Sequence, residues 1–341
     1  MFEHRYMRRA LELAELGRGN VAPNPMVGCV IVHEAKIIGE GYHKKYGEPH
    51  AEVNAINSVK DPALLKESTL YVTLEPCSHF GKTPPCADLI IKKNIRKVAI
   101  ACRDPFEQVD GKGIERLQKA GIEVEVGMLE QEAKIQNARF FTFHSIKRPY
   151  VILKWAQTAD GFLARTNGDS KWISNSHSRQ LVHKWRSEED AILVGQTTAE
   201  IDNPSLTTRQ WVGKNPIRIV LDRKLQTPKN FKLFDDKATT YIMNTEREEE
   251  AGSNRWIKLS TMNPGAILEK LHELRIQSVI IEGGSAVLNS FIADDCWDEA
   301  RVFQSEQLFG KGLKAPKLEE TLIGKSSVQD DQLFIYKNQH G

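Results

Sequence analysis

At 341 residues the chain is too long for one ordinary hydrophobic core, so about two domains are expected. Its 40% hydrophobic and 27% charged content is typical of a globular protein, and a formal net charge of +2 does not by itself favour a nucleic-acid partner. No apolar run approaches the roughly 20 residues of a membrane span, and the first residues lack an apolar signal core, so no membrane partner and a cytoplasmic location are expected.

Helices and strands alternate along the predicted first half. Apolar residues at helical spacing predict a helix over 4–17, and a loop rich in Asn and Pro follows it. The other expected elements are strands over 26–32, 36–42, 69–74, 97–102 and 122–126, and helices over 50–58, 113–120 and 130–144. This order predicts an α/β domain in which helices cover a parallel or mixed sheet.

Three residues of metal-binding type are spaced along this half: His50, Cys77 and Cys86. One imidazole and two thiols suit tetrahedral zinc with a fourth position left for water. Glu52 follows His50 by two residues, close enough to reach that water without binding the metal. Zinc deaminases use such a non-ligating Glu beside a His/Cys/Cys zinc, with the signature H-x-E and then P-C-x-x-C. Here eight residues separate the two cysteines instead of two.

A structural zinc site closed by His79 is the alternative, but it leaves Glu52 without a task. Other polar residues near the motif have two interpretations. His43 contacts substrate or is a surface histidine, and His79 and Lys82 bind the substrate's phosphate or belong to a solvated loop. Asn24, in an Asn-Pro-x-Val-Gly loop, hydrogen-bonds a pyrimidine edge or is structural.

The run from Cys77 to Cys86, with His50-Ala51-Glu52 upstream, resembles the deaminase half of the bifunctional riboflavin-biosynthesis deaminase/reductase family. The resemblance implies a cytidine-deaminase-like three-layer domain over 1–145, and Asn24 matches the family's substrate loop. A short basic segment with a proline break, Ser145 to Pro149, marks the expected domain boundary.

The second half, 149–341, resembles the family's reductase domain, which has a dihydrofolate-reductase-like fold. The matching segments, in order, are 150–161, 168–174, 185–187, 191–195, 198–209 and 281–285. The cofactor-binding residues that the resemblance implies are Ala156, Trp172, Thr198, Asp202, Arg223, Gly284, Ser285, Ala286, Val287, Leu288, Asn289 and Ser290. The implied substrate-binding residues are Lys154, Ser170, Arg186, Leu206, Arg209 and Glu282.

Physical reasons support several of these assignments. A predicted strand over 279–282 is joined to a predicted helix over 286–292 by Gly283-Gly284-Ser285. At such a turn the backbone and the helix N-terminus can approach a phosphate group. The alternative is that the glycines only allow a tight turn. The absence of G-x-G-x-x-G disfavours an ordinary Rossmann site. Arg186 and Arg209 suit a sugar phosphate, or they form surface ion pairs.

Two further predictions concern the segments that follow. A strand over 217–221 leads to Arg223, which would favour the 2′-phosphate of NADPH unless it is simply an exposed turn residue. The charged stretch 244–256 is expected to be a solvated surface segment.

The resemblance implies a riboflavin-pathway enzyme with one Zn²⁺ per chain and NADPH, and a homo-oligomer is expected. It would deaminate 2,5-diamino-6-(5-phosphoribosylamino)pyrimidin-4(3H)-one and then reduce its ribosyl chain. Two rivals remain at this point. A deaminase of free or nucleic-acid cytidine or adenosine is opposed by the balanced charge and the reductase half. The other rival is a binding module that a structural zinc stabilises, with a degenerate nucleotide-binding half. Zinc analysis and an ammonia-release assay would distinguish it from an enzyme.

Overall fold

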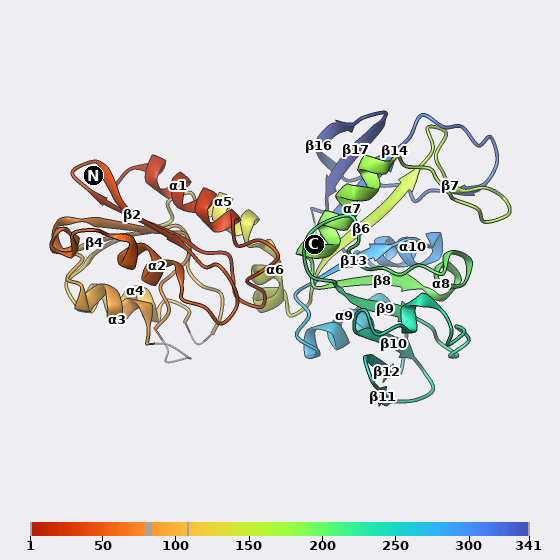
Figure 1. Ribbon diagram of the computed structural model, residues 1–341, viewed down its shortest axis with the longest axis horizontal. Helices are drawn as coiled ribbons and strands as arrows, with labels where there is room; N and C mark the ends of the chain where they lie inside the picture. Colours follow the sequence, from red (N-terminus) through yellow and green to blue (C-terminus); the bar gives the residue numbers. More distant parts are fainter. Residues whose placement is uncertain (1, 79–83, 108, 340–341) are drawn as a thin grey trace. The chain divides into compact units, whose positions relative to one another are not determined.

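The computed structural model describes residues 2–78, 84–107 and 109–339. The chain divides into two compact units, Met1–Lys147 and Arg148–Gly341, so the division falls within the predicted linker (Figure 1). His79 and Lys82 lie outside the described residues. None of the helices in the described part of the chain is long and apolar enough to cross a membrane.

Unit 1 is built on a five-stranded mixed sheet of order β2-β1-β3-β4-β5, in which β3, β4 and β5 run parallel. Strand β1 pairs antiparallel with both β2 and β3. The elements are α1 (His4–Glu15), β1 (Gly28–His33), β2 (Lys36–Tyr42), α2 (Ala51–Ser58), a 3₁₀ helix (Pro62–Glu67), β3 (Thr69–Val72), α3 (Cys86–Lys92), β4 (Lys97–Ile100), α4 (Lys112–Lys119), β5 (Glu123–Val126), α5 (Glu130–Gln136), α6 (Ala138–Phe141) and a π-helical turn (Thr142–Ile146).

Alternation along the strands gives unit 1 two cores, one on each face of the sheet. In β1, Cys29 and Ile31 pack with residues of α2, α3 and α4. Their neighbours Val30 and Val32 point the other way and pack with α1. Successive side chains of a strand face opposite sides, so a buried central strand needs a helical layer on each. Unit 1 therefore has three layers.

The single helix predicted over 130–144 is wrong, because Asn137 interrupts it between α5 and α6. Asn137 departs from helical geometry with φ −100° and ψ 25°. Its buried side chain accepts the N–H of Met26 at 2.8 Å and donates to the Met26 carbonyl at 2.8 Å. A side-chain amide that pairs with distant backbone competes with helix hydrogen bonding, and helical periodicity does not reveal it.

Unit 2 is built on a ten-stranded sheet of order β11-β12-β10-β9-β8-β13-β6-β14-β17-β16 (Figure 1). The seven strands from β12 to β14 are parallel, and β11, β17 and β16 join antiparallel. The strands of this sheet are β6 (Tyr150–Gln157), β8 (Ala191–Gly195), β9 (Ile217–Leu221), β10 (Thr240–Asn244), β11 (Glu249–Ala251), β12 (Asn254–Lys258), β13 (Ser278–Glu282), β14 (Glu299–Gln304), β16 (Thr321–Val328) and β17 (Asp331–Lys337). Strands β7 (Phe162–Ala164) and β15 (Leu313–Lys314) pair in a separate two-stranded sheet.

Helices cover both faces of the large sheet. They are α7 (Ser176–Glu188), α8 (Gln196–Asp202), a 3₁₀ turn (Lys232–Phe234), α9 (Pro264–Glu273) and α10 (Ser285–Ala293). On β14, Val302 belongs to the core formed with α9 and α10. The next residue, Phe303, points to the other face and stacks on Trp185 of α7 with ring centroids 5.5 Å apart.

The charged stretch 244–256 is only partly the solvated segment that its composition predicts. Its middle, including β11, is exposed. The two ends of the stretch are buried, since Asn244 is the last residue of β10 and Trp256 lies in β12. Strand β12 pairs with β10 and must bury one face, whereas charges on the short edge strand β11 protect it from unwanted pairing.

Two glycines let α2 lie close against β2. A Cβ added to Gly39 would come within 2.6 Å of the Ala55 carbonyl oxygen. One added to Gly41 would lie 2.3 Å from the Ala55 nitrogen and 2.6 Å from the Ala51 oxygen. These separations are shorter than real Cβ contacts, so any larger residue displaces the helix. The same helix begins directly after His50 and carries Glu52.

We expect Gly41→Ala to displace α2 and to lower zinc content and deaminase activity by about 10-fold or more, because small misplacements of reacting groups are costly. Reductase activity should be unchanged, since α2 belongs to unit 1. Gly265→Ala, where a Cβ meets nothing closer than 3.7 Å, is the matched control. Normal zinc content and ammonia release in Gly41→Ala would contradict the packing argument.

Candidate active sites

The three predicted zinc ligands come together in unit 1. His50 caps α2, Cys86 begins α3 and Cys77 lies in the turn after β3. His50 Nδ1 is 3.6 Å from Cys77 Sγ and 3.4 Å from Cys86 Sγ, and the three ligand atoms lie within 4.8 Å of one another. Tetrahedral zinc, with bonds of about 2.3 Å to sulfur and about 2.0 Å to nitrogen, separates these atoms by about 3.5 Å. The triad therefore fits zinc.

Glu52 lies beside this triad and is only 3% exposed. Burial raises the pKa of Glu52 to about 7, against the opposing effect of nearby His50. Contacts from Cys86 and His50 lower the pKa of the Cys77 thiol, and the Cys86 backbone N–H donates to Cys77 Sγ at 3.3 Å. Such surroundings favour the thiolate that a metal requires.

Glu75 supports the Pro76-Cys77 turn, a role that sequence analysis did not assign. The buried carboxylate accepts four backbone N–H groups at 2.8–3.2 Å, those of Asp104, Gly111, Gly113 and Ile114. These bonds hold the start of α4 against the turn, where a Cβ on Gly113 would lie 2.1 Å from the Pro76 oxygen. The position of a Glu directly before Pro-Cys at a strand end was the available signal.

Asn24 and His43 lie together next to the metal triad. Asn24 Nδ2 is 3.1 Å from His43 Nε2, and His43 Nδ1 is 3.2 Å from the Pro49 carbonyl oxygen. The His43 ring packs edge-on against His50 with centroids 5.4 Å apart. His43 is 2% exposed, so the interpretation as a surface histidine is wrong.

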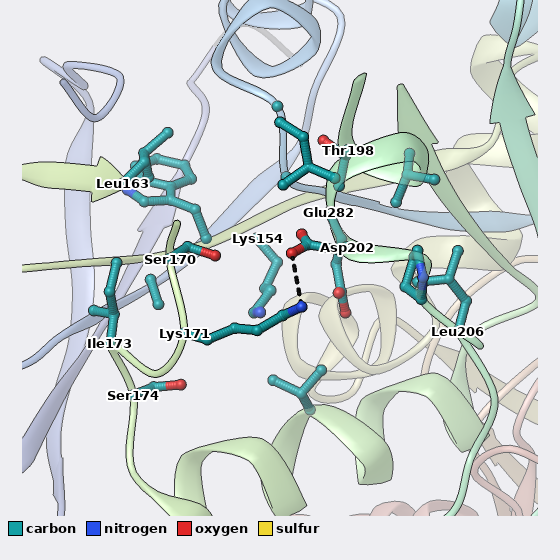
Figure 2. Close-up of a pocket in the computed structure, with 18 of the residues that line it drawn as sticks. Lys154, Leu163, Ser170, Lys171, Ile173, Ser174, Thr198, Asp202, Leu206 and Glu282 are labelled. Carbon is teal, nitrogen blue, oxygen red and sulfur yellow. Dashed lines mark ion pairs between the residues drawn. The ribbon is translucent and has the colours of Figure 1, made fainter. Parts of the chain in front are cut away.

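Unit 2 holds a cavity of about 780 Å³ at the carboxyl ends of β6, β8 and β13 (Figure 2). Ligands of open α/β sheets bind at such strand ends. Lys154 and Glu282 are register partners on β6 and β13, so their side chains share a face. The predicted residues that line the cavity are Lys154, Ala156, Ser170, Trp172, Arg186, Thr198, Asp202, Leu206, Arg209, Glu282, Gly284 and Ser285.

Charged groups in the cavity are paired in specific ways. Arg186 donates to both carboxylate oxygens of Glu282, at 3.2 and 2.8 Å, and to the Thr207 carbonyl at 3.4 Å. Burial opposes ionisation of Glu282, but Arg186 and Lys154 lower its pKa to about 2. Burial lowers the pKa of Lys154. Figure 2 shows the Lys171 side chain extending across the cavity to Asp202, and Lys171 Nζ is 3.5 Å from Asp202 Oδ1.

Sequence analysis missed Lys171 and two residues of α7, Arg179 and His183, that also line the cavity. Arg179 and His183 precede Arg186 by seven and three positions, so they share its face of the helix. The predicted role of Arg186 and helical spacing could have indicated both.

Several predicted cofactor residues lie beyond the cavity lining. Arg223 is an exposed residue after β9, and its carbonyl accepts the Thr245 N–H at 3.1 Å. Residues 286–290 continue α10 away from the Gly284-Ser285 turn, and Leu288 among them is buried in the core. The turn is close-packed, since a Cβ on Gly284 would lie 3.0 Å from Thr198 Oγ1.

Comparisons with known proteins agree with both units. Residues 2–102 match the cytidine and deoxycytidylate deaminase zinc-binding region, and residues 149–331 match the RibD C-terminal domain. The chain is 45% identical to riboflavin biosynthesis protein RibD of Aquifex aeolicus over 97% of each protein. It is 44% identical to that of Bacillus amyloliquefaciens, over 93% of this chain and 87% of the relative. A Thermotoga maritima structure, a diaminohydroxyphosphoribosylaminopyrimidine deaminase/5-amino-6-(5-phosphoribosylamino)uracil reductase, matches with TM-score 0.89 and 40% identity over 98% of each chain.

A zinc-binding, cytidine-deaminase-like domain joined to a dihydrofolate-reductase-like domain defines a bifunctional deaminase/reductase. The chain belongs to the RibD family of riboflavin biosynthesis proteins. This confirms the resemblance and both predicted folds, and it argues against a nucleic-acid deaminase and a non-enzymatic binding module. The two domains imply zinc and a nicotinamide cofactor.

Cys77→Ser and Cys86→Ser should each lose most of the bound zinc, and the deaminase activity of each should fall by about 10²-fold or more. The two remaining protein ligands cannot hold the metal in tetrahedral geometry. Metal analysis and ammonia release on the same samples test this. Cys102→Ser is the matched control, a buried thiol that donates to the Thr73 carbonyl at 3.4 Å and lies outside the triad. Zinc retained in either triad variant would show that the ligand set is different.

Proposed function

We propose that unit 1 hydrolyses the 2-amino group of 2,5-diamino-6-(5-phosphoribosylamino)pyrimidin-4(3H)-one. Unit 2 then reduces the ribosyl chain of the product with NADPH, giving 5-amino-6-(5-phosphoribitylamino)uracil. The observation that carries the proposal is buried Glu52 beside a triad of ligand groups found among the described residues, because hydrolysis requires a metal position for water and a carboxylate nearby. The activities named for the Thermotoga maritima protein support the choice of substrate.

In unit 1, His50, Cys77 and Cys86 would hold one Zn²⁺ per chain, which supplies a bound water of lowered pKa. Glu52 would take a proton from the attacking water and pass it to the ring nitrogen. It would then carry a second proton, from the newly added hydroxyl, to the leaving amino group, so that a carbonyl remains on the ring. A carbon–oxygen bond forms, the carbon–nitrogen bond breaks and ammonia leaves. Asn24, held by His43, orients the pyrimidine edge.

In unit 2, NADPH supplies the hydride when it is bound. The predicted cofactor residues that line the cavity would hold it, and the backbone N–H groups at the start of α10 would face its phosphates. Lys154 and Glu282 bind the ribose near the carbon that is reduced, and Arg186 fixes the orientation of Glu282. Ser170 and Leu206 complete the substrate side of the cavity. Arg209, on the rim, binds the sugar phosphate. The homo-oligomer and the cytoplasmic location stay predictions from the sequence.

Glu52→Gln should keep its zinc and lose deamination by about 10²-fold or more, because an amide cannot shuttle the proton. Given 5-amino-6-(5-phosphoribosylamino)uracil, the same variant should oxidise NADPH at the wild-type rate. Metal content, ammonia release and absorbance of NADPH are the three measurements.

Glu48→Gln, at an exposed position just before the motif, is the matched control and should match wild type in all three. Near-normal ammonia release from Glu52→Gln would eliminate the proton-transfer role. Loss of NADPH oxidation in a folded Glu52→Gln protein would instead indicate one shared site.

Arg223→Ala should raise the KM for NADPH by about 10-fold or more and leave that for NADH nearly unchanged, because a charge-assisted hydrogen bond to the 2′-phosphate contributes roughly 1.5–3 kcal/mol. The adjacent exposed residue provides a control in Lys224→Ala. Equal effects on the two cofactors, or no effect, would place recognition of the 2′-phosphate elsewhere.

A further inference from the structure

His183, which lines the reductase cavity, has no part in the chemistry described above. His183 lies on the face of α7 that also presents Arg179 and Arg186 to the cavity. It is only 5% exposed, so its ring is enclosed by protein on nearly every side. A buried imidazole needs hydrogen-bond partners, and the partners of His183 determine what the ring can do.

Those partners are in the backbone of the segment Thr207–Arg209, which follows α8. The Arg209 N–H donates to His183 Nδ1 at 3.2 Å, and the backbone of Thr207 lies close enough to the ring to favour its proton. A backbone N–H can only donate, so Nδ1 must be unprotonated and a neutral ring carries its proton on Nε2. His183 thereby fastens the segment to α7.

The charges around His183 favour the same neutral form. Arg186 on its own helix and Arg209 on the facing segment repel a proton, whereas Glu282 on β13 and the Thr207 backbone attract one. Burial is the largest effect, and together with the two arginines it lowers the pKa of His183 to about 4. The ring therefore remains a hydrogen-bond acceptor for Arg209 throughout the neutral pH range.

The two arginines beside His183 differ in what they leave free. All three nitrogens of Arg186 have partners in Glu282 and Thr207. Within the described ranges, the guanidinium of Arg209 makes one hydrogen bond, from Nη1 to Thr207 Oγ1 at 3.1 Å. Arg209 is exposed at the cavity and thus retains donors for an anionic ligand.

We propose that His183 is a positioning residue for the substrate's phosphate. It fixes the Thr207–Arg209 backbone, so that the Arg209 guanidinium is oriented before the phosphate binds. Thr207 Oγ1 orients the side chain while His183 holds the main chain. Ordering the anchor before binding removes an entropic cost from association. The inference rests on the proposed substrate and on Arg209 as its phosphate ligand.

The test uses the full zinc-loaded chain, NADPH, and two substrates: 5-amino-6-(5-phosphoribosylamino)uracil and its counterpart lacking the phosphate. His183→Phe keeps a ring but removes the acceptor, and should raise the KM for the phosphorylated substrate by about 10-fold. Its kcat and its KM for NADPH should stay within about 2-fold of wild type. With the phosphate-free substrate, kcat/KM should be nearly the same in variant and wild type.

His183→Asn should restore most of the loss, because the amide oxygen can accept the Arg209 N–H from nearly the place of Nδ1. His177→Phe, an exposed histidine on the same helix, is the control and should behave as wild type. In an Arg209→Ala background, His183→Phe should have little further effect, since the two residues act through one contact.

Three results would overturn the assignment. Equal losses on both substrates would mean that His183→Phe damages the cavity generally. Failure of His183→Asn to recover would show that the acceptor is irrelevant, and full additivity with Arg209→Ala would show that the residues act separately. A wild-type enzyme inactive on both substrates would overturn the proposed function as well, whereas the first three results leave that function intact.

Discussion

The carboxyl ends of parallel strands open at one edge of a sheet, and both candidate active sites depend on this constraint. In unit 1 the turn after β3 delivers Cys77, and in unit 2 the ends of β6 and β13 bring Lys154 and Glu282 side by side. Crossover helices leave this edge uncovered, so polar side chains and helix N-termini gather there. Residues far apart in the chain thereby become neighbours.

Three buried glutamates show how surroundings assign different tasks to one side-chain type. Glu75 accepts four backbone N–H groups and is a structural support for the metal-binding turn. Glu282 lies between two cations, which keep it ionised and orient it in the cavity. At Glu52 burial outweighs the groups that stabilise its charge, so its pKa is raised and suits it to exchange protons.

Local patterns predicted most strands and helices of unit 1 within a few residues but only a few elements of unit 2, and several of the differences have tertiary causes. The predicted strand over 217–221 matches β9, which pairs with β8 and β10 and buries its three central residues. The helix over 130–144 breaks because Asn137 pairs with Met26, 111 positions away in the chain. Trp256 is buried in a stretch of charged residues because β12 pairs with β10. Neither partner can be identified from the residues nearby.

The sequence by itself identified the family and predicted a zinc-ligand set with Glu52 beside it, because these follow from residue type, spacing and the order of motifs. Only the tertiary structure decided which charges neutralise one another, since ion pairs join separate elements. Among the described residues it showed Arg186 paired with Glu282 and the Arg209 guanidinium with one hydrogen bond, although the two arginines look alike in the sequence. The neutral state of His183 likewise depends on a backbone N–H that only folding brings to its ring.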